Sequence, residues 1–233
     1  MKNKYDHIFF DLDHTLWDFE TNSKETLQTI FIKHKINEVS NKTFEFFFQK
    51  YKFYNRQLWK EYELGRLAKE DLRTHRFIKA LLAIGIDDIS LSYSISEEYS
   101  DVCPHKTALI PHSIDVLEYL ENKNYIIHLI TNGFEEVQHI KIKKSGIDKF
   151  INQMITPEQA GCKKPRIGIF QHAFKKTGAN NRNSIIIGDS YHSDIEGGMN
   201  IGMDTIFFNP EKSKYNKKPS HDIDCLSALY KIL

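Results

Sequence analysis

Short apolar runs along the chain predict the strands of a buried β-sheet. They fall at about 7–10, 125–130, 151–155, 184–187 and 205–208. Between the later runs, apolar residues recur every three or four positions, which is the period of a helix buried on one side. Alternation of strands and helices favours a parallel sheet with helices on its faces. The pattern therefore predicts an α/β fold with a Rossmann-like parallel sheet flanked by helices.

The helices between these strands are bounded by typical start and stop residues. Proline is common near the start of a helix and glycine just past its end. One predicted helix begins near Pro111, and another begins near Pro165. A third covers 134–144, and we expect Val137 and Ile140 on its buried side.

The segment from 18 to 105 has a different pattern, which predicts an all-helical insert. It contains no convincing strand, but three apolar stripes recur at helical spacing. We therefore expect a core domain made of 1–17 and 106–233, and a helical domain made of 18–105. The stripes consist of Leu27, Ile30 and Phe31, then Phe44, Phe47, Phe48 and Tyr51, and then Phe77, Ile78, Leu81 and Leu82.

Composition narrows the class of protein. The net charge of +1 over 233 residues argues against a broad nucleic-acid-binding surface. The cysteines Cys103, Cys162 and Cys225 form no CxxC pair, so we expect reduced thiols and a cytoplasmic protein. The first residues lack the apolar core of a signal peptide, and no apolar run approaches the ~18–20 residues of a membrane-spanning helix. Neither nucleic acid nor membrane is expected as a partner, and the oligomeric state stays open.

Two strand-like runs end abruptly in carboxylates. Asp11 and Asp13 follow the first run, and Asp189 and Asp194 follow the run at 184–187. Open α/β sheets bind ligands at the carboxyl ends of their strands, so these side chains should converge. Carboxylates so close together repel one another unless a cation lies among them. Ligands that are all oxygens favour Mg²⁺, which we predict as the cofactor.

The first two aspartates suit two different roles in phosphoryl transfer. A carboxylate that attacks phosphorus forms an aspartyl-phosphate and splits one hydrolysis into two displacements, and we assign this role to Asp11. Asp13, two residues on, points to the same side of an extended chain. It suits a general acid that protonates the leaving oxygen and then a base that activates water. Mg²⁺ should keep Asp11 ionised, whereas Asp13 can hold a proton.

Two further segments carry candidate phosphate-binding groups. Thr131, Asn132 and Gly133 follow the second strand, where a hydroxyl and backbone N–H groups can cradle a phosphate. The same tripeptide is also an ordinary turn. Lys164 would offset the charge of the nucleophile and of the phosphoryl oxygens, with Lys163 as the alternative.

Taken together, these segments resemble the haloacid dehalogenase-like (HAD) hydrolase superfamily. The resemblance is carried by DxDxT at Asp11–Thr15, by Thr131 after the second strand, by Lys164 before a proline, and by GDxxxxD at Gly188–Asp194. It implies that the helical insert is the C1 cap of this superfamily.

The resemblance also implies a metal site and a branch of the superfamily. Mg²⁺ would be bound by Asp11, by the backbone carbonyl of Asp13 and by Asp189, with Asp194 assisting nearby. An acid at position 13 implies a phosphatase rather than a dehalogenase. The partner would then be a small-molecule phosphate ester.

Three other segments are similar to the YjjG-like pyrimidine 5′-nucleotidase branch: 13–19, 58–62 and 130–134. This similarity implies hydrolysis of nucleoside 5′-monophosphates. Trp17, Phe19 and Trp59 are then candidates for stacking on a base, although aromatic side chains also bury apolar area by simple packing. The alternatives are a phosphatase of sugar phosphates or related metabolites, a phosphomutase, and a non-catalytic binding module on the same scaffold.

Overall fold

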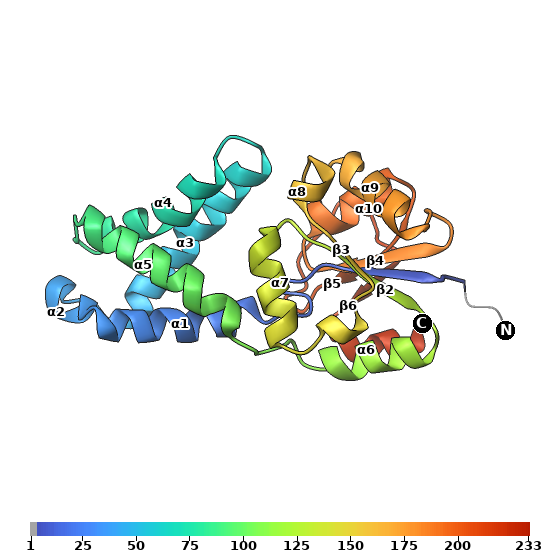
Figure 1. Cartoon of the computed structure of the whole chain (residues 1–233), viewed down its shortest axis with the longest axis horizontal. Coiled ribbons are helices and arrows are strands. Elements are labelled where there is room, and N and C mark those ends of the chain that lie inside the picture. The colour runs from blue at the N-terminus through green and yellow to red at the C-terminus, as the bar shows by residue number, and fades with distance from the viewer. Residues whose placement is uncertain (1–3) are drawn as a thin grey trace. The chain divides into compact units, whose positions relative to one another are not determined.

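The computed structural model describes residues 4–233. The chain forms two compact units (Figure 1). Among the described residues, the α/β unit comprises 4–19 and 107–233, and the helical unit comprises Glu20–Lys106.

The α/β unit is built on one parallel sheet, as the sequence predicts. Its strand order is β3-β2-β1-β4-β5-β6, and every neighbouring pair is parallel. Strands β1 and β4 are therefore adjacent, with Phe10 in register with Ile187. The strands are β1 (His7–Phe10), β2 (Ile126–Ile130), β3 (Gln153–Ile155), β4 (Ser184–Gly188), β5 (Asp204–Phe208) and β6 (His221–Ile223).

The two central strands are buried along their whole length, which explains their unbroken apolar sequences. Phe9 and Ile186 belong to one core cluster with Phe170 of helix α9 (Ile167–Thr177). Strand β6 was not predicted. Two of its three residues are exposed and it lies at the sheet edge, so it has no apolar run to reveal it.

Helices lie on both sides of the sheet, with α9 and α10 on one side and α6 on the other (Figure 1). Helix α9 ends at Gly178, whose φ of 77° is the left-handed conformation that glycine adopts readily. The helices of this unit are α6 (Ser113–Asn122), α7 (Glu135–Lys144), α8 (Pro157–Ala160), α9 (Ile167–Thr177) and α10 (Gly197–Asn200), with the shorter segments η2 (Asp148–Phe150), η3 (Tyr191–Glu196) and η4 (Leu226–Lys231).

Helix α7 forms where it was predicted, but it buries a different face. Gln138 and Lys141 are buried together with Ile142, whereas Val137 and Ile140 are only half-buried. The expectation for Val137 and Ile140 was therefore wrong. It assumed that apolar residues decide which side of the helix turns inward.

The helical unit contains only helices, and its long helices carry the predicted apolar stripes. Thr43 caps α3 by accepting a hydrogen bond from the Phe46 amide. The third stripe is partly wrong, since Leu82 is 48% exposed and Arg76 is buried beside Phe77 instead. The helices are α1 (Phe19–Lys33), α2 (Ile36–Ser40), α3 (Phe44–Glu63), α4 (Lys69–Leu82) and α5 (Ile89–Val102), followed by η1 (Cys103–His105).

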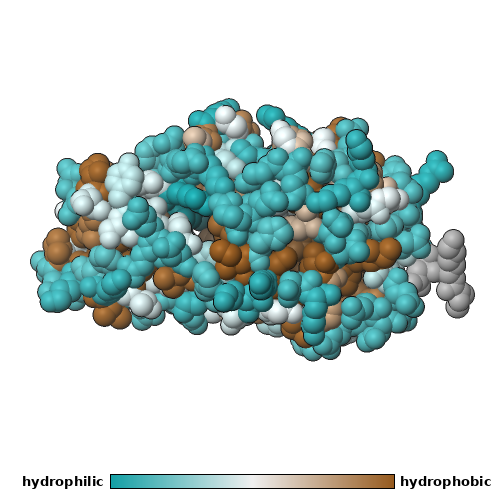
Figure 2. Space-filling view, viewed as in Figure 1, coloured by the Kyte–Doolittle hydropathy of each residue, from teal (hydrophilic) through white to brown (hydrophobic). Residues whose placement is uncertain are grey.

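On the face shown in Figure 2, hydrophilic residues predominate and hydrophobic residues occupy smaller patches. Within residues 4–233, none of the helices combines the length and the apolar character needed to cross a membrane.

A buried histidine pair joins the first two strands of the chain. His7 Nδ1 lies 3.1 Å from His128 Nε2, and the ring of His128 also stacks on Phe9. His128 is fully buried. Burial, and then the neighbouring His7, lower the pKa of His128 to about 4.

This pair predicts a pH dependence of stability. The folded-state pKa of His128 lies below the ordinary value of about 6.5, so the unfolded chain takes up the proton first as the pH falls. Its contribution to the free energy of unfolding is complete above about pH 6.5 and is lost by about pH 4. Denaturant unfolding of wild type should show a loss about 2–3 kcal/mol larger over this interval than unfolding of His128→Gln. Equal losses in both proteins would contradict this role for His128.

Candidate active site

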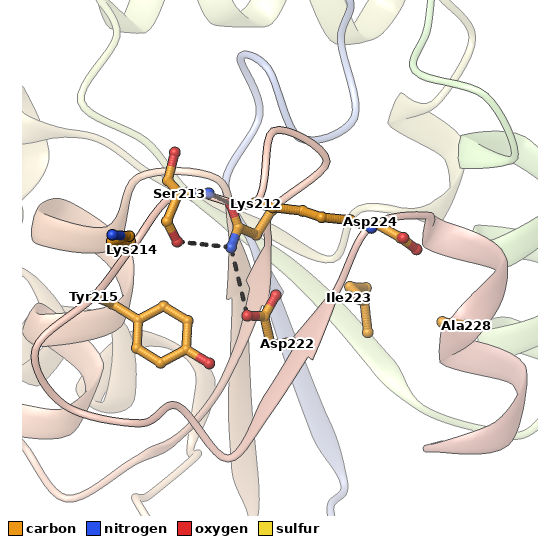
Figure 3. Close-up of a pocket in the computed structure, with 9 residues that line it drawn as sticks. Lys212, Ser213, Lys214, Tyr215, Asp222, Ile223, Asp224 and Ala228 are labelled. Atoms are coloured by element: carbon orange, nitrogen blue, oxygen red, sulfur yellow. Dashed lines mark hydrogen bonds between the residues drawn. The ribbon is translucent and has the colours of Figure 1, made fainter.

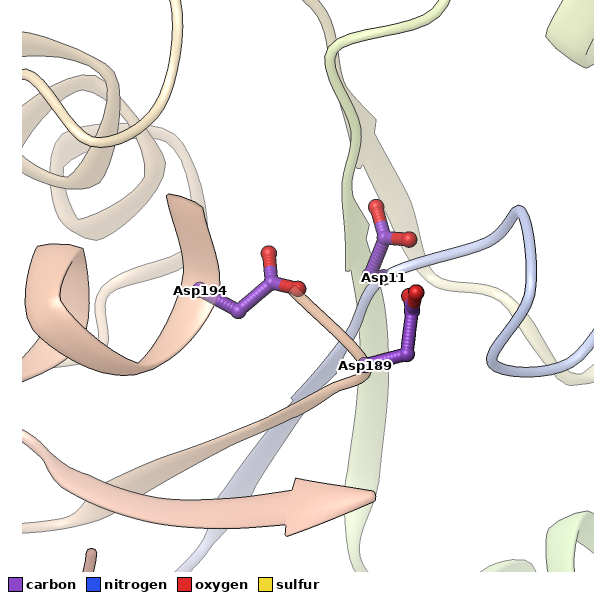
Figure 4. Close-up of side chains that lie close together, drawn as sticks. All are labelled: Asp11, Asp189 and Asp194. Atoms are coloured by element: carbon purple, nitrogen blue, oxygen red, sulfur yellow. The ribbon is translucent and has the colours of Figure 1, made fainter. Parts of the chain in front are cut away.

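Three of the predicted aspartates lie together at the carboxyl edge of the sheet. Asp11 follows β1 and Asp189 follows β4, so the parallel pairing of these strands makes them neighbours. Asp194 reaches toward them from η3 (Figure 4). One carboxylate oxygen from each of the three lies within 4.8 Å of the others. This cluster has the oxygen donors and the spacing of a divalent-cation site.

Local hydrogen bonds hold two of these carboxylates in place. Thr15 Oγ1 donates to Asp189 Oδ1 at 3.0 Å and accepts from the Asp189 amide at 3.1 Å. Asp194 Oδ2 accepts from the Ser190 amide at 3.0 Å. A Cβ at Gly188 would lie 2.2 Å from Asp194 Oδ2, so only glycine permits this approach. The glycine at the start of the segment 188–194 thus has a steric reason within this chain.

Lys164 is the lysine that the fold buries beside the aspartates. Its Nζ donates to Asp11 Oδ1 at 2.7 Å, to Asp194 Oδ1 at 2.6 Å and to the Ile130 carbonyl oxygen at 2.6 Å. The residue is 2% exposed, whereas Lys163 is half-buried. Of the two alternatives, Lys164 is therefore the lysine whose ammonium group contacts the predicted catalytic carboxylates.

Asn132 holds this lysine in place through the backbone. Its Oδ1 accepts from the Lys164 amide at 2.8 Å, and its Nδ2 donates to the Lys164 carbonyl oxygen at 3.0 Å. Both polar atoms of the Asn132 side chain therefore hydrogen-bond to the backbone of Lys164. The prediction that Asn132 helps to bind phosphate is therefore kept for its backbone N–H group. Its side chain bonds to Lys164 instead.

Burial and crowding shift the ionisation of the cluster. Burial, together with neighbouring carboxylates, raises the pKa values of Asp11, Asp189 and Asp194, although Lys164 opposes this shift. Burial alone would lower the pKa of Lys164, but Asp11 and Asp194 raise it above its ordinary value. Lys164 is therefore a fixed positive charge.

Asp13 is held by a different set of partners. Lys141 Nζ donates to Asp13 Oδ1 at 2.6 Å, and Gln138 Nε2 donates to Asp13 Oδ2 at 2.9 Å. Gln138 Nε2 also lies 2.7 Å from Thr131 Oγ1, which in turn accepts from the Gly133 amide at 3.0 Å. The side chain of Asp13 is not among the three that form the possible metal site.

Lys141 and Gln138 were missed in the sequence. Both lie on α7, for which the sequence analysis named Val137 and Ile140 as the buried side. The consequence for Asp13 is large. Burial would raise the pKa of its carboxyl group, but Lys141 and Gln138 lower it below its ordinary value. These two donors therefore favour the carboxylate form of Asp13 over the protonated form that the sequence analysis allowed.

The candidate base-stacking residues have different surroundings. Trp17 is fully buried, and Lys141 Nζ lies 4.4 Å from the centre of its ring. Phe19 is half-buried and contacts the ring of His14. Trp59 belongs to the helical unit, is half-buried and packs edge-on against Tyr62. For Trp17, the alternative of packing fits these contacts better than stacking on a base.

A separate surface pocket lies beside β6 (Figure 3). Tyr215 and Asp222 line it, together with the loop that follows β5. Asn209 donates from its Nδ2 to the Ser213 carbonyl oxygen and to Asp222. None of the predicted site residues lines this pocket, so the chemistry points to the aspartate cluster instead.

Comparison with known proteins places the chain in a family. The family model of haloacid dehalogenase-like hydrolases matches residues 8–208. The chain belongs to this family. Its site residues therefore sit in a hydrolase scaffold, and the predicted resemblance is confirmed.

Individual relatives cover nearly the whole chain. The pyrimidine 5′-nucleotidase YjjG of Escherichia coli (strain K12) is 28% identical over 207 residues, which cover 88% of this chain and 87% of that protein. The pyrimidine 5′-nucleotidase PynA of Streptococcus pneumoniae is 27% identical over 237 residues and covers 95% of both chains. The solved structure of the HAD-hydrolase YfnB from Bacillus subtilis, bound to magnesium, aligns with a TM-score of 0.88 at 26% identity and covers 99% of both chains.

The surroundings of Lys164 predict a large effect on stability. Lys164→Met would leave the buried carboxylates of Asp11 and Asp194 without their cation. In EDTA and at mildly alkaline pH, the free energy of unfolding should fall by about 3–5 kcal/mol. Lys163→Met is the matched control, because it makes the same chemical change at a half-buried neighbour. Denaturant unfolding checks this, and similar losses in both variants would contradict the assignment to Lys164.

Proposed function

We propose that this chain is a Mg²⁺-dependent phosphomonoester hydrolase that works through an aspartyl-phosphate on Asp11. The observation that carries the proposal is the contact of the Asp11 carboxylate with the buried ammonium of Lys164 at 2.7 Å, beside two further aspartates. This arrangement offers a nucleophile, a fixed positive charge and a set of oxygen ligands at one edge of the sheet.

Charge balance supports a divalent cation. Asp11, Asp189 and Asp194 contribute three negative charges when ionised, and Lys164 contributes one positive charge. Two negative charges are left over, which one divalent cation would balance. Asp11, Asp189 and the backbone carbonyl of Asp13 are the proposed ligands, with Asp194 assisting. When bound, the cation would offset the charge of these groups and of the phosphoryl oxygens of the substrate.

The first chemical step transfers the phosphoryl group to the enzyme. An oxygen of Asp11 bonds to phosphorus while the bond from phosphorus to the leaving oxygen breaks. The acid form of Asp13, which the second step regenerates, gives its proton to that leaving oxygen, which departs as an alcohol. Lys164 stabilises the charge that moves from the nucleophile onto the phosphoryl oxygens.

The second step returns the enzyme to its starting state. A water oxygen bonds to phosphorus while the bond to Asp11 breaks, and a proton of that water passes to the carboxylate of Asp13. The ionised Asp13 held by Lys141 suits this step directly. We place the phosphoryl oxygens against the hydroxyl of Thr131 and the backbone N–H groups of Asn132 and Gly133, as predicted.

We propose pyrimidine nucleoside 5′-monophosphates as the substrates. The support is the similarity to two proteins named pyrimidine 5′-nucleotidases, which covers most of each chain. The groups around Asp11 deal with the phosphate alone, so a phosphatase of sugar phosphates or related small metabolites remains the alternative. We retain Phe19 and Trp59 as candidates for contact with the base.

The proposed metal site predicts that phosphatase activity depends on Mg²⁺. Release of inorganic phosphate from 4-nitrophenyl phosphate should stop in EDTA and return with Mg²⁺. Ca²⁺ should restore it poorly, because it is larger and prefers more ligands than an octahedral site provides. Asp11→Asn, measured in parallel, defines the background without the nucleophile. Full activity of wild type in EDTA, or turnover by Asp11→Asn near that of wild type, would contradict the proposed chemistry.

The substrate is tested by comparing KM values over a panel of pyrimidine and purine monophosphates, hexose phosphates and triose phosphates. Pyrimidine monophosphates should have the highest kcat/KM. Stacking on a base is worth about 1–3 kcal/mol, so Phe19→Ala or Trp59→Ala should raise their KM by roughly 5–150-fold and leave 4-nitrophenyl phosphate nearly unchanged.

Phe53→Ala is the control for these aromatic variants, since Phe53 is 55% exposed in the same helical unit as Trp59. A panel led by sugar phosphates would favour the alternative. Equal effects of the alanine variants on nucleotides and on 4-nitrophenyl phosphate would mark both aromatics as packing residues.

A further inference from the structure

Gln138 and Lys141 form a polar face of α7 that carries none of the roles proposed for the sequence motifs. They lie three residues apart, so they project from the same side of the helix. Gln138 is fully buried and Lys141 is 5% exposed. Burying an amide and an ammonium group is costly unless each finds partners, so this face calls for an explanation.

The partners of this face are the predicted catalytic residues. The two oxygens of Asp13 each accept one hydrogen bond, Oδ1 from Lys141 at 2.6 Å and Oδ2 from Gln138 at 2.9 Å. Two donors on different oxygens fix the plane of a carboxylate as well as its position. A single ion pair would leave the group free to rotate about the contact.

Gln138 also ties Asp13 to the phosphate-binding turn. Its Nε2 lies 2.7 Å from Thr131 Oγ1, so one amide nitrogen joins the segment after β1 to the segment after β2. A Cβ at position 133 would lie 2.2 Å from that nitrogen. Gly133 is therefore required for the approach of Gln138, in addition to any contact with phosphate.

The ring of Trp17 contacts the ammonium group of Lys141. The Lys141 ammonium lies 4.4 Å from the centre of the Trp17 ring, a cation–π distance. Trp17 itself is fully buried. Through this contact the indole ring can stabilise the ammonium group of Lys141, and this role does not require the ring to touch a substrate.

We propose that Gln138 and Lys141 are positioning residues of the reaction: together they fix the Asp13 carboxyl group for proton transfer to the leaving oxygen and from water. The proposal rests on the proposed function, because it presumes that Asp13 transfers those protons. The proposal gives a role to residues of α7, which lie outside the motifs that carry the family resemblance.

A kinetic test separates positioning from a structural role. Phosphoenzyme formation is followed by rapid acid quench in Mg²⁺ with two esters, 4-nitrophenyl phosphate and a nucleoside 5′-monophosphate. The nitrophenolate leaves without a proton, whereas the alkoxide of the nucleotide needs one. General acid catalysis is worth roughly 10²–10⁴-fold, so Lys141→Met should slow transfer from the nucleotide by about 10–100-fold and from the aryl ester by less than about threefold.

A double variant sharpens the test. If Lys141 acts only through Asp13, Lys141→Met should add no further loss to Asp13→Asn. Gln138→Met should show the same dependence on the leaving group, which keeps the proposal testable if Lys141→Met does not fold. Lys144→Met removes an exposed lysine of the same helix and should match wild type with both esters.

The outcomes are distinct. Equal losses with the two esters, or losses that add to that of Asp13→Asn, would overturn the positioning role while wild-type activity upholds the proposed function. A wild-type enzyme that transfers phosphate from neither ester in Mg²⁺ would overturn both.

Discussion

The ammonium of Lys164 is the charge on which the site depends. Three carboxylates lie at one buried edge of the sheet, and electrostatic repulsion would drive them apart or force them to take up protons. Lys164 bonds to two of them and to the carbonyl oxygen at the end of β2. It therefore links the residue after β1, the end of β2 and η3, and Asn132 in turn holds its backbone.

The second constraint is steric, because two side chains of the site approach the backbone very closely. The carboxylate of Asp194 and the amide of Gln138 reach the site only because the residues they pass have no side chain. A Cβ at Gly188 or at Gly133 would come within 2.2 Å of these groups. Both glycines lie at or just after the end of a strand, where the chain turns toward the next helix. Close approach of side chain to backbone, not backbone flexibility, explains their presence.

Residue type alone was enough to predict the sheet and the aspartates that follow its strands. Apolar runs that end in carboxylates are visible without any knowledge of packing. The role of α7 was not visible, because Gln138 and Lys141 look like the solvent side of an amphipathic helix. They turn inward only because Asp13 and Thr131 offer them partners, and such partners, distant along the chain, come together only in the fold.

Burial also decided between residues that the sequence could not rank. Lys163 and Lys164 carry the same group, and their different exposure comes from the turn that holds the second one. Trp17 and Trp59 were equally plausible as stacking residues. Trp17 lies buried beneath a lysine ammonium, whereas Trp59 is half-buried in the helical unit. Edge strand β6 escaped prediction because exposed polar residues carry no period-2 signal.

The most direct test of the account is to find the covalent intermediate. Asp13→Asn enzyme, in which hydrolysis of the intermediate should be slowed, is mixed with 4-nitrophenyl phosphate and Mg²⁺, quenched in acid, digested and mapped by mass spectrometry. The account predicts one phosphoryl group on the peptide that contains Asp11, and none there when Asp11 is also replaced by Asn. A phosphoryl group on another residue, or turnover with no trapped phosphoenzyme, would contradict it.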